Sequence, residues 1–431
     1  MFLLLVVLSF SIFFLLNLFK DKNIKKTGQL PPGPKGLPII GNLHQFDPAH
    51  PHLCLYDFAK TYGPLMSMKF GFRAAIVVSS ARVAKLALKN NDMALSGRPR
   101  LIALNKLTYN GSDISASSYN ATWREMRKIG ILHLFSAKQV VSFRPVREDE
   151  VSCMIEDMIE KSKSNKLINI SRSMFLLTNS FICRAGFGKK YDDQEKRGFN
   201  DLFKENQAML AEFFDIFIAG TETSATLIVW AMTSLMKTPR AMKKAQEEVR
   251  NLVDNKGAVD EDDVPNLPYL KAIIKETLRL FPPAPLSIPR ETIERCTIDG
   301  YEIRPKTVVY VNVHAIGLDP EYWENPTEFN PDRFLDSTID YRGQDFGLLP
   351  FGSGRRGCPG INMGIAIVEL ALANLLYTFD WELPIGMKKE DIDMETSPGI
   401  TVAKKNDLCL VGKCHTYKYQ NHVNHEWLKF L

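Results

Sequence analysis

The sequence predicts a mainly α-helical fold with a small β portion. Apolar or amphipathic stretches typical of helices cover residues 213–236, 241–253, 268–280 and 361–379, whereas the alternation typical of strands is confined to 65–79 and 307–313. Of the 431 residues, 45% are hydrophobic and 24% are charged, as in globular proteins. No Ser/Gly linker, repeat or low-complexity run divides the chain after residue 40, so we expect one large domain over 41–410.

Residues 1–20 are expected to anchor the chain in a membrane. The stretch 2–19 is apolar apart from two serines and one asparagine, which is just long enough for a helix to cross a bilayer. No small-residue cleavage site follows, which favours a retained anchor over a removed signal peptide. Four lysines between residues 20 and 26 begin a basic flank and proline-rich hinge over 21–40, and positive flanks stay cytoplasmic. We therefore expect a single-pass protein of the endoplasmic reticulum membrane, in contact with lipid, with its body in the cytosol.

Charge and cysteine usage argue against a nucleic-acid-binding protein, a disulfide-stabilised protein and a protein with a cysteine metal cluster. The net charge of +5 is small for this length and does not indicate a nucleic-acid partner. The seven cysteines are scattered and odd in number, without paired metal-ligand spacing, which favours a reducing compartment. The eight histidines form no cluster with metal-ligand spacing either.

The body shows clear element boundaries. The runs 65–70 and 74–79 read as a hairpin around Gly71. The helix over 268–280 begins with a proline in its first turn and stops before Pro282. The apolar stretch 361–379 is long enough to cross a membrane, but polar residues such as Glu369 interrupt it, so we expect a buried core helix.

The most informative segment is 351–360, with the sequence FGSGRRGCPG. It places one cysteine, Cys358, in a glycine-rich loop directly before an apolar helix. A lone thiolate cannot close a zinc site, but it can be the axial ligand of haem iron. The glycines let backbone approach a flat macrocycle, and Arg356 can pair with a haem propionate. The alternative is a free buried cysteine in a surface turn, which does not require this density of glycine and arginine.

Two arginines and one glutamate suggest a structural clamp. Glu276 and Arg279 lie three apart on the helix over 268–280 and so share a face. Arg333, in a proline-bounded loop, offers a second guanidinium to the same carboxylate. The alternative is a solvated helical ion pair; the clamp is favoured because the arginine loop and the cysteine loop follow in order.

Glycine, acidic and threonine residues interrupt the apolar helix over 213–236. Gly220 would make room for a flat cofactor or a bound gas, and Glu222 and Thr223 could relay protons to bound dioxygen. A helix kink with satisfied hydroxyl groups explains this segment equally well.

Further basic residues are candidates for the propionates. Trp123 and Arg127 lie four apart and can reach them together, whereas Arg124 and Lys128 would face outward toward an acidic electron donor. A solvated basic helix is a strong alternative for the outward pair. Arg98 and Arg290 are further candidates, although each also reads as an ordinary loop arginine.

With these pieces in order, residues 30–410 resemble a cytochrome P-450 of the plant microsomal type that serves specialised metabolism. Three segments carry the resemblance: LPPGPKGLPIIGNLHQ at 30–45, SFRPVRE at 142–148 and the cysteine loop. It implies a monooxygenase with thiolate-ligated haem b that inserts one atom of O2 into a small lipophilic substrate. Electrons would come from an NADPH-cytochrome reductase, a flavoprotein. The roles that it implies are Cys358 as iron ligand, Phe351, Gly352 and Gly360 around the sulfur, Trp123, Arg127, Arg290, Arg356 and Arg98 at the propionates, Glu222 and Thr223 in catalysis, and Glu276, Arg279 and Arg333 as the clamp.

The chain departs from the family pattern in two places. Only 100 residues separate Trp123 from Thr223, fewer than the family carries, and the gap falls near Phe214 and Asp215. Helices that roof the distal side of the pocket would then be missing, and residues 411–431 form an atypical C-terminal tail. Because a dry site protects the reaction from side reactions, we expect this chain to hold haem but to turn over poorly. The alternative function is a truncated haem-binding product with little or no coupled activity.

Overall fold

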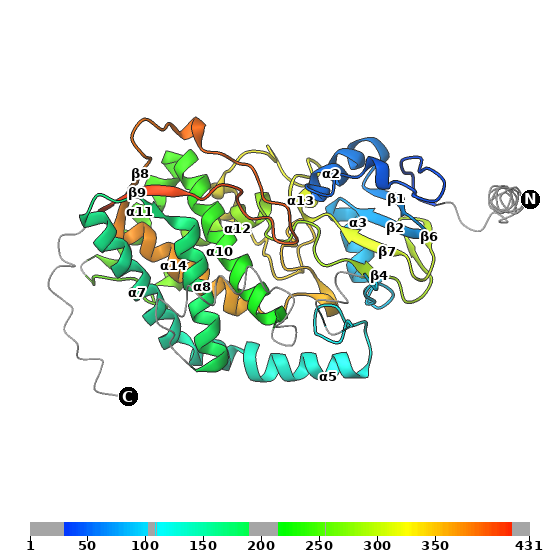
Figure 1. Ribbon diagram of the computed structural model, residues 1–431, viewed down its shortest axis with the longest axis horizontal. Helices are drawn as coiled ribbons and strands as arrows, with labels where there is room; N and C mark the ends of the chain where they lie inside the picture. The colour runs from blue at the N-terminus through cyan, green and yellow to red at the C-terminus, as the bar shows by residue number, and fades with distance from the viewer. Residues whose placement is uncertain (1–29, 102–107, 109, 189–213, 255, 416–431) are drawn as a thin grey trace, which may run out of the picture.

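The structure is a computed structural model that describes residues 30–101, 108, 110–188, 214–254 and 256–415. Helices are the predominant secondary structure of the described residues, and a four-stranded sheet lies at the right-hand end of the molecule in Figure 1. The prediction of a mainly α fold with a small β portion is confirmed. The expected anchor at 1–20 lies outside the described residues.

The helices follow the predicted ranges closely in the second half of the chain. They are α2 Pro51–Tyr62, α3 Ala81–Lys85, α5 Ala121–Gly130, α6 Ala137–Ser142, α7 Arg144–Lys163, α8 Ile170–Phe187, α10 Phe214–Lys237, α11 Pro239–Val253, α12 Pro268–Leu280, α13 Val313–Gly317 and α14 Ile361–Thr378. Helix α12 shows why: Pro268 lacks an N–H that a first turn does not need. The carboxylate of Glu248 accepts the free N–H groups of Tyr269 and Leu270 at 2.7 and 2.9 Å.

The four-stranded sheet has the order β1-β2-β7-β4. Its strands are β1 Leu65–Phe70, β2 Arg73–Val78, β7 Val308–Val311 and β4 Arg290–Glu291. The predicted hairpin is present, with Leu65 opposite Val78 and Phe70 opposite Arg73. Strand β7 adds to β2 in parallel, and β4 pairs antiparallel with β7 at the edge. This edge matters for function, because β4 begins with a candidate propionate residue, Arg290.

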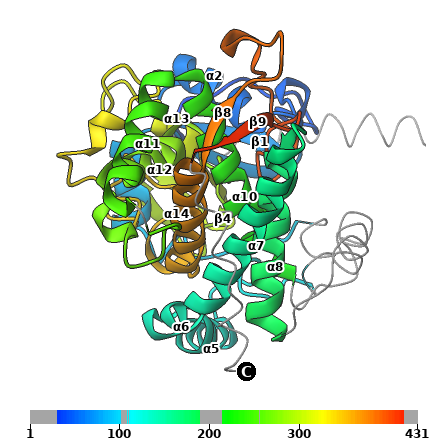
Figure 2. The same cartoon turned by 90° about the vertical axis from the view of Figure 1, so that its left-hand side faces the viewer.

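Helix α14 is the central element of the helical part. Figure 2 shows it between α11 and α12 on one side and α7 and α10 on the other. Leu370, Leu372 and Leu376 on this helix are completely buried. Among the described residues, α14 is the one helix long and apolar enough to cross a membrane, and 72% of it is buried inside the protein. The prediction of a buried core helix after Cys358 is therefore confirmed.

A smaller sheet corrects the predicted C-terminal boundary. Strands β3 Ile168–Asn169, β9 Cys409–Cys414 and β8 Phe379–Glu382 pair in that order. Residues 411–414 of the expected tail thus belong to the fold, because β9 pairs with β8 as far as Cys414 opposite Phe379. Such a short strand is stabilised by its partners and has little signal of its own. Two further strands, β5 Cys296–Ile298 and β6 Tyr301–Ile303, form a separate hairpin.

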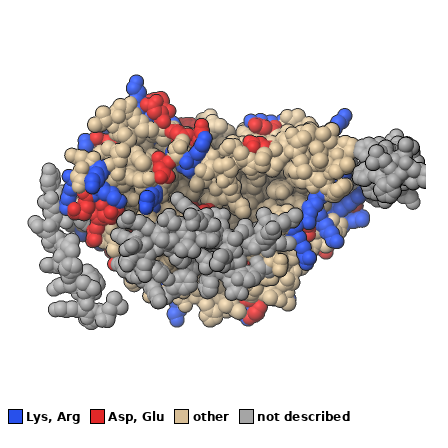
Figure 3. Space-filling model, in the orientation of Figure 1, with Lys and Arg blue, Asp and Glu red and all other residues tan. Residues whose placement is uncertain are grey.

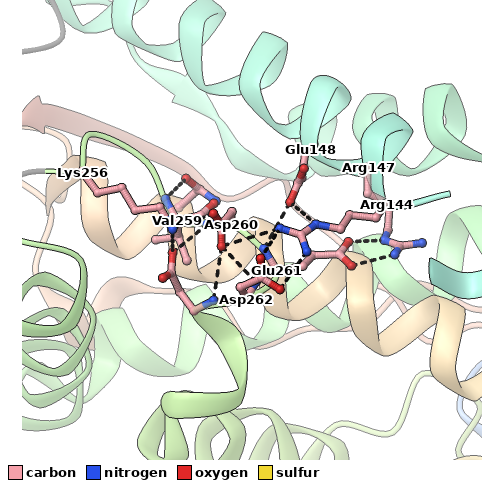
Figure 4. Close-up of polar contacts among 10 residues, drawn as sticks. Arg144, Arg147, Glu148, Lys256, Val259, Asp260, Glu261 and Asp262 are labelled. Atoms are coloured by element: carbon pink, nitrogen blue, oxygen red, sulfur yellow. Dashed lines mark hydrogen bonds and ion pairs between the residues drawn. The ribbon is translucent and has the colours of Figure 1, made fainter. Parts of the chain in front are cut away.

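An ionic network fastens the start of α7 to the loop before α12 (Figure 4). Arg147 is completely buried and holds both carboxylate oxygens of Glu261, at 2.5 and 2.8 Å. Beside it, Arg144 binds Glu148 at 2.7 Å and both oxygens of Asp262 at 2.8 and 2.9 Å. One guanidinium nitrogen of Arg147 also lies 3.5 Å from the sulfur of Met363 on α14. The network therefore fixes α7 against the helix that follows the cysteine.

Charges of both signs are interspersed on the surface. On the face shown in Figure 3, acidic and basic side chains alternate around the end formed by α7, α11 and β8. This mixing agrees with the small net charge of +5.

Candidate active site

Cys358 lies in a folded loop directly before α14. The N–H of Cys358 donates to the carbonyl of Phe351 at 2.8 Å, which closes the loop on itself. Gly352 and Gly354 have φ of 69° and 66°, the left-handed region that favours glycine. Burial raises the pKa of the Cys358 thiol, while the N–H of Gly360 and the charge of Arg127 act in the opposite direction. The residue as a whole nevertheless keeps accessible surface, so Cys358 is not sealed inside the protein core.

Phe351 and Gly360 frame the sulfur. The Phe351 ring packs edge-on against Tyr341, with 5.6 Å between centroids, on the side of the main core. A Cβ added to Gly360 would lie 4.0 Å from the sulfur of Cys358 and 3.6 Å from the Phe135 ring. Gly360 therefore leaves the space beside the sulfur free of a side chain.

Three buried arginines converge beside the loop. Arg356 donates to the carbonyls of Ser96 and Ser117 at 2.8 and 2.7 Å. Arg290, from β4, donates to the carbonyl of Ser353 at 2.8 Å. Arg98 donates to the carbonyls of Ser115, Ile288 and Pro289 at 2.7, 2.7 and 2.9 Å.

A fourth arginine contacts the cysteine loop itself. Arg127, on α5, donates to the carbonyl of Gly357 at 2.6 Å, one residue before Cys358. Burial lowers the pKa of this guanidinium, and the neighbouring Cys358 raises it. Arg127 therefore binds the cysteine loop directly and interacts electrostatically with the thiol.

The arginine cluster fits an anionic ligand. Burial lowers the pKa of Arg290 to about 10, and burial with repulsion from Arg290 and Arg127 lowers that of Arg356 to about 10. Within the described residues, one terminal nitrogen of Arg290 and one of Arg356 have no hydrogen-bond acceptor. Buried guanidinium groups that repel one another and retain free donors are suited to carboxylate groups such as haem propionates.

Trp123 supports this cluster from α5. The side chain is 3% exposed, and its ring centroid lies 4.1 Å from the guanidinium carbon of Arg356. Its indole N–H donates to the carbonyl of Ile114 at 2.9 Å. Arg124 and Lys128 on the same helix are exposed, as expected for the outward pair.

The structure brings the three clamp residues together. Arg279 donates to both carboxylate oxygens of Glu276 at 2.7 Å, and both side chains are completely buried. Arg333 binds the same carboxylate at 3.1 Å, and the N–H of Asn330 donates to it at 2.8 Å. Arg279 also donates to the carbonyl of Gly317 at 2.7 Å. Helix α12 is thereby joined to α13 and to the loop that leads toward Cys358.

Helix α10 holds Glu222 and Thr223. The Thr223 hydroxyl donates to the carbonyl of Ala219 one turn earlier. Burial raises the pKa of Glu222, and a hydrogen bond with Thr401 lowers it. Both residues thus lie on the turn where the sequence placed them.

Gly220 packs closely against a neighbouring helix. A Cβ at this position would lie 2.7 Å from the end of the Ile182 side chain on α8, so the absent side chain lets α10 approach α8. This contact is a packing reason for glycine at position 220. Helical spacing alone cannot tell which neighbour faces a glycine.

Sequence reasoning missed one carboxylate in this region. Asp92, in the turn before Arg98, lies 3.7 Å from Arg290 and also forms an ion pair with Arg355. It is one acidic residue among several in the sequence, without a motif, and only the fold brings it to the cysteine loop.

Comparisons with known proteins agree with this site. The family model for cytochrome P-450 matches residues 31–214 and 205–411. Strychnine-11-hydroxylase of Strychnos nux-vomica is 42% identical over 495 residues, covering 94% of this chain and 97% of that protein. The 6,7,8-trihydroxycoumarin synthase of Pastinaca sativa is 39% identical, covering 96% and 99%. A zebra fish cytochrome P-450 solved with abiraterone has a TM-score of 0.74 at 22% identity, covering 85% of this chain and 99% of that one.

The fold and the cysteine loop define a haem-thiolate protein. The chain belongs to the cytochrome P-450 family and is a monooxygenase of the plant type. Family and fold together imply thiolate-ligated haem b as its cofactor.

Proposed function

We propose that this chain is a membrane-anchored monooxygenase that oxygenates a small lipophilic metabolite of plant specialised metabolism. The observation that carries the proposal is that Cys358, which keeps accessible surface, lies beside buried arginines, two of whose terminal nitrogens have no hydrogen-bond acceptor among the described residues. The names of the relatives support the substrate class, because they describe a hydroxylase for strychnine and a synthase for a trihydroxycoumarin. The single-pass anchor at 1–20 and the endoplasmic reticulum location are part of the proposal.

The roles of the cofactor-binding residues follow from their positions. Cys358 would ligate the iron, with Phe351, Gly352 and Gly360 shaping the loop around its sulfur. The residues that would hold the propionates are Arg98, Arg127, Arg290, Arg356 and Trp123. When bound, the haem supplies the activation of dioxygen that lets one oxygen atom enter the substrate. The clamp of Glu276, Arg279 and Arg333 would keep the loop before Cys358 in place.

Glu222 and Thr223 would handle protons on the distal side. The carboxyl of Glu222 is disposed to carry a proton because burial raises its pKa, and its link to Thr401 fixes its orientation. The Thr223 hydroxyl can pass a proton on, since its bond to the Ala219 carbonyl holds it on one turn of α10.

The outward face of α5 would receive the reductase. Arg124 and Lys128 are exposed there, and the ion pair of Lys128 with Glu125, at 3.5 Å, lies at the surface. The same helix carries Arg127, which binds the cysteine loop, so this face is the short route for electrons to the thiol. An acidic patch on an NADPH-cytochrome reductase would match it.

We further propose that the chain lacks a segment near Phe214 and Asp215. Two observations support this. The family model matches in two pieces that meet at 205–214, and the alignment with strychnine-11-hydroxylase runs over 495 positions although this chain has 431 residues. Loss of distal helices would admit water, so the bound cofactor would consume NADPH without matching product.

The test is the ratio of NADPH oxidised to product formed, with a plant reductase and with strychnine or a hydroxycoumarin as trial substrates. A matched variant carries the corresponding segment of strychnine-11-hydroxylase inserted between Phe214 and Asp215. We expect the natural chain to oxidise NADPH with little product, and the insertion to raise the product per NADPH. One product per NADPH from the natural chain would overturn the proposed loss. No NADPH oxidation by either protein would overturn the proposed activity.

A further inference from the structure

A single carboxylate, Asp92, lies between the cysteine loop and the arginine cluster. It belongs to the turn after residues 86–90, six residues before Arg98 and far in sequence from Arg290 and from the cysteine loop. Its side chain is only 13% exposed. None of the roles considered above requires an acidic residue at this place, where a carboxylate would compete with propionates for arginine.

The carboxylate binds the first half of the cysteine loop. The backbone N–H of Arg355 donates to one oxygen of Asp92 at 3.2 Å and reaches the other at 3.5 Å. The guanidinium of Arg355 forms an ion pair with the same carboxylate. Backbone and side chain of one loop residue are therefore both held by Asp92, which fixes the loop in position and in rotation.

Gly354 is shaped to admit this carboxylate. A Cβ at Gly354 would lie 2.2 Å from one oxygen of Asp92, which is far inside contact distance. Its φ of 66° also requires glycine. Glycine is thus required at position 354 for two reasons: the left-handed backbone of the turn and the close approach of Asp92.

Asp92 also reaches the arginine cluster. Its carboxylate lies 3.7 Å from Arg290, whose other terminal nitrogen donates to the carbonyl of Ser353 at 2.8 Å. The Ser353 hydroxyl in turn donates to the carbonyl of Gly343 at 2.6 Å. Arg290 therefore binds the loop at Ser353, and Asp92 binds it at Arg355. Because Asp92 also lies beside Arg290, it contacts both the loop and the arginine.

We propose that Asp92 is a positioning residue that fixes the Cys358 loop in place relative to the arginine cluster that would hold the propionates. The proposal rests on the haem site described above and deepens it. Asp92 anchors the loop at Arg355, three residues before the thiol, and offsets part of the positive charge of Arg290. Without it, the loop would keep its contacts at Ser353, Arg356 and Gly357 but would lose both contacts at Arg355, and the sulfur would be less firmly positioned.

The test compares Asp92→Asn with the natural chain in the full-length protein. Two quantities are measured: the rate of haem transfer to an acceptor protein, and the share of thiolate-ligated complex in the ferrous carbon-monoxide spectrum. We expect haem to leave about tenfold faster, as for loss of a charge-assisted hydrogen bond. We also expect the thiolate-ligated share to fall, because the protonated thiol becomes the ligand in more of the molecules. Gly354→Ala should reproduce the spectral change while Asp92 is still present, because its Cβ displaces the carboxylate.

Two controls separate positioning from general stability. Asp299→Asn removes a partly exposed carboxylate that binds Arg82, on α3, at 2.6 and 2.9 Å. Iron-free protoporphyrin has propionates but no iron, so its affinity reports the arginine cluster alone. We expect Asp92→Asn to leave that affinity unchanged or higher, and its urea midpoint to match that of Asp299→Asn.

The outcomes are distinct. The proposal is overturned if Asp92→Asn matches Asp299→Asn in haem transfer and spectrum, or if its porphyrin affinity and urea midpoint fall together with haem retention. A natural chain without thiolate-ligated haem would instead overturn the proposed function, whatever the Asp92 variant does.

Discussion

The guanidinium of Arg356 stacks on the ring of Trp123, with 4.1 Å between its central carbon and the ring centroid. The two residues are separated by more than half of the chain. Arg356 comes from the cysteine loop and Trp123 from α5. Their contact joins the two parts of the protein that would hold the cofactor from the side of the thiol.

Replacement of Trp123 by phenylalanine should weaken both stability and haem retention. The change removes the indole N–H bond to Ile114 and weakens the cation–π contact, together about 1–2 kcal/mol of unfolding free energy. Trp381→Phe is a matched control, because Trp381 is also buried and its indole donates to Leu375 at 3.0 Å. Urea unfolding should shift for both variants, and haem should be lost faster only from Trp123→Phe. Equal haem loss would contradict the support role of Trp123.

Replacement of Glu276 by glutamine should be among the most destabilising single changes in the protein. It leaves Arg279 buried without a counter-charge, and breaking such a pair costs roughly 3–5 kcal/mol. Asp57→Asn, which removes the surface partner of Lys60, should cost less than about 1 kcal/mol. Chemical denaturation of both variants checks this. A loss of similar size in the two would show that the clamp is not a buried charge network.

Stability should fall with acidification between pH 6.5 and 4. The rings of His52 and His314 pack edge-on with 5.3 Å between centroids, and burial lowers the pKa of each to about 4. In this range the unfolded chain binds protons that the folded chain does not, so protonation favours unfolding, by about 1.4 kcal/mol for each unit of pKa difference. Repulsion from His314 and then His50 adds to the effect at His52.

The measurement is the urea midpoint at pH 7 and pH 5 for the natural chain and for a variant with His52→Gln and His314→Gln. The natural chain should lose stability on acidification, and the variant should lose clearly less. The same pH dependence in both proteins would assign the effect to other groups.

The three glycosylation sequons, which start at Asn110, Asn120 and Asn169, should stay unmodified if the body lies in the cytosol. Asn120 caps α5 by accepting the N–H of Trp123 at 2.7 Å, and Asn169 caps α8 by accepting that of Arg172 at 2.8 Å. A glycan would disturb both caps. Protein made in plant microsomes should therefore show no change in mobility after treatment with a glycosidase. A shift that is abolished by Ser171→Ala, which destroys one sequon, would place the body in the lumen.

Much of the fold could be predicted where local chemistry is strong. Helix α12 was bounded correctly because proline marks both ends, and α14 because a long apolar run follows a glycine-rich loop. The boundary at residue 410 was wrong because β9 depends on pairing with β8, and pairing partners cannot be read from six residues. The contact of Gly220 with Ile182 could not be predicted for a similar reason, since Ile182 belongs to another helix.

Charged residues of the candidate site could be named from the sequence, but the backbone groups that they bind could not. Arg356 could be named because it stands two residues before the cysteine, whereas Arg98 and Arg290 read as ordinary loop arginines and their propionate role came from the resemblance to the family. Their actual partners are mostly carbonyl groups, such as those of Ser96 and Ser117, which carry no side-chain signal. Asp92 could not be predicted, because it is brought beside Arg355 only by the fold and the two residues are more than 250 positions apart in the sequence.

The central claim is that Cys358 holds haem through its thiolate, and the ferrous carbon-monoxide difference spectrum tests it most directly. We expect the full-length chain to give the absorption of a thiolate-ligated complex, and Cys358→Ala to lose it while keeping some porphyrin bound through the arginine cluster. A natural chain that binds no haem, or a thiolate-type spectrum that persists in Cys358→Ala, would contradict the assignment.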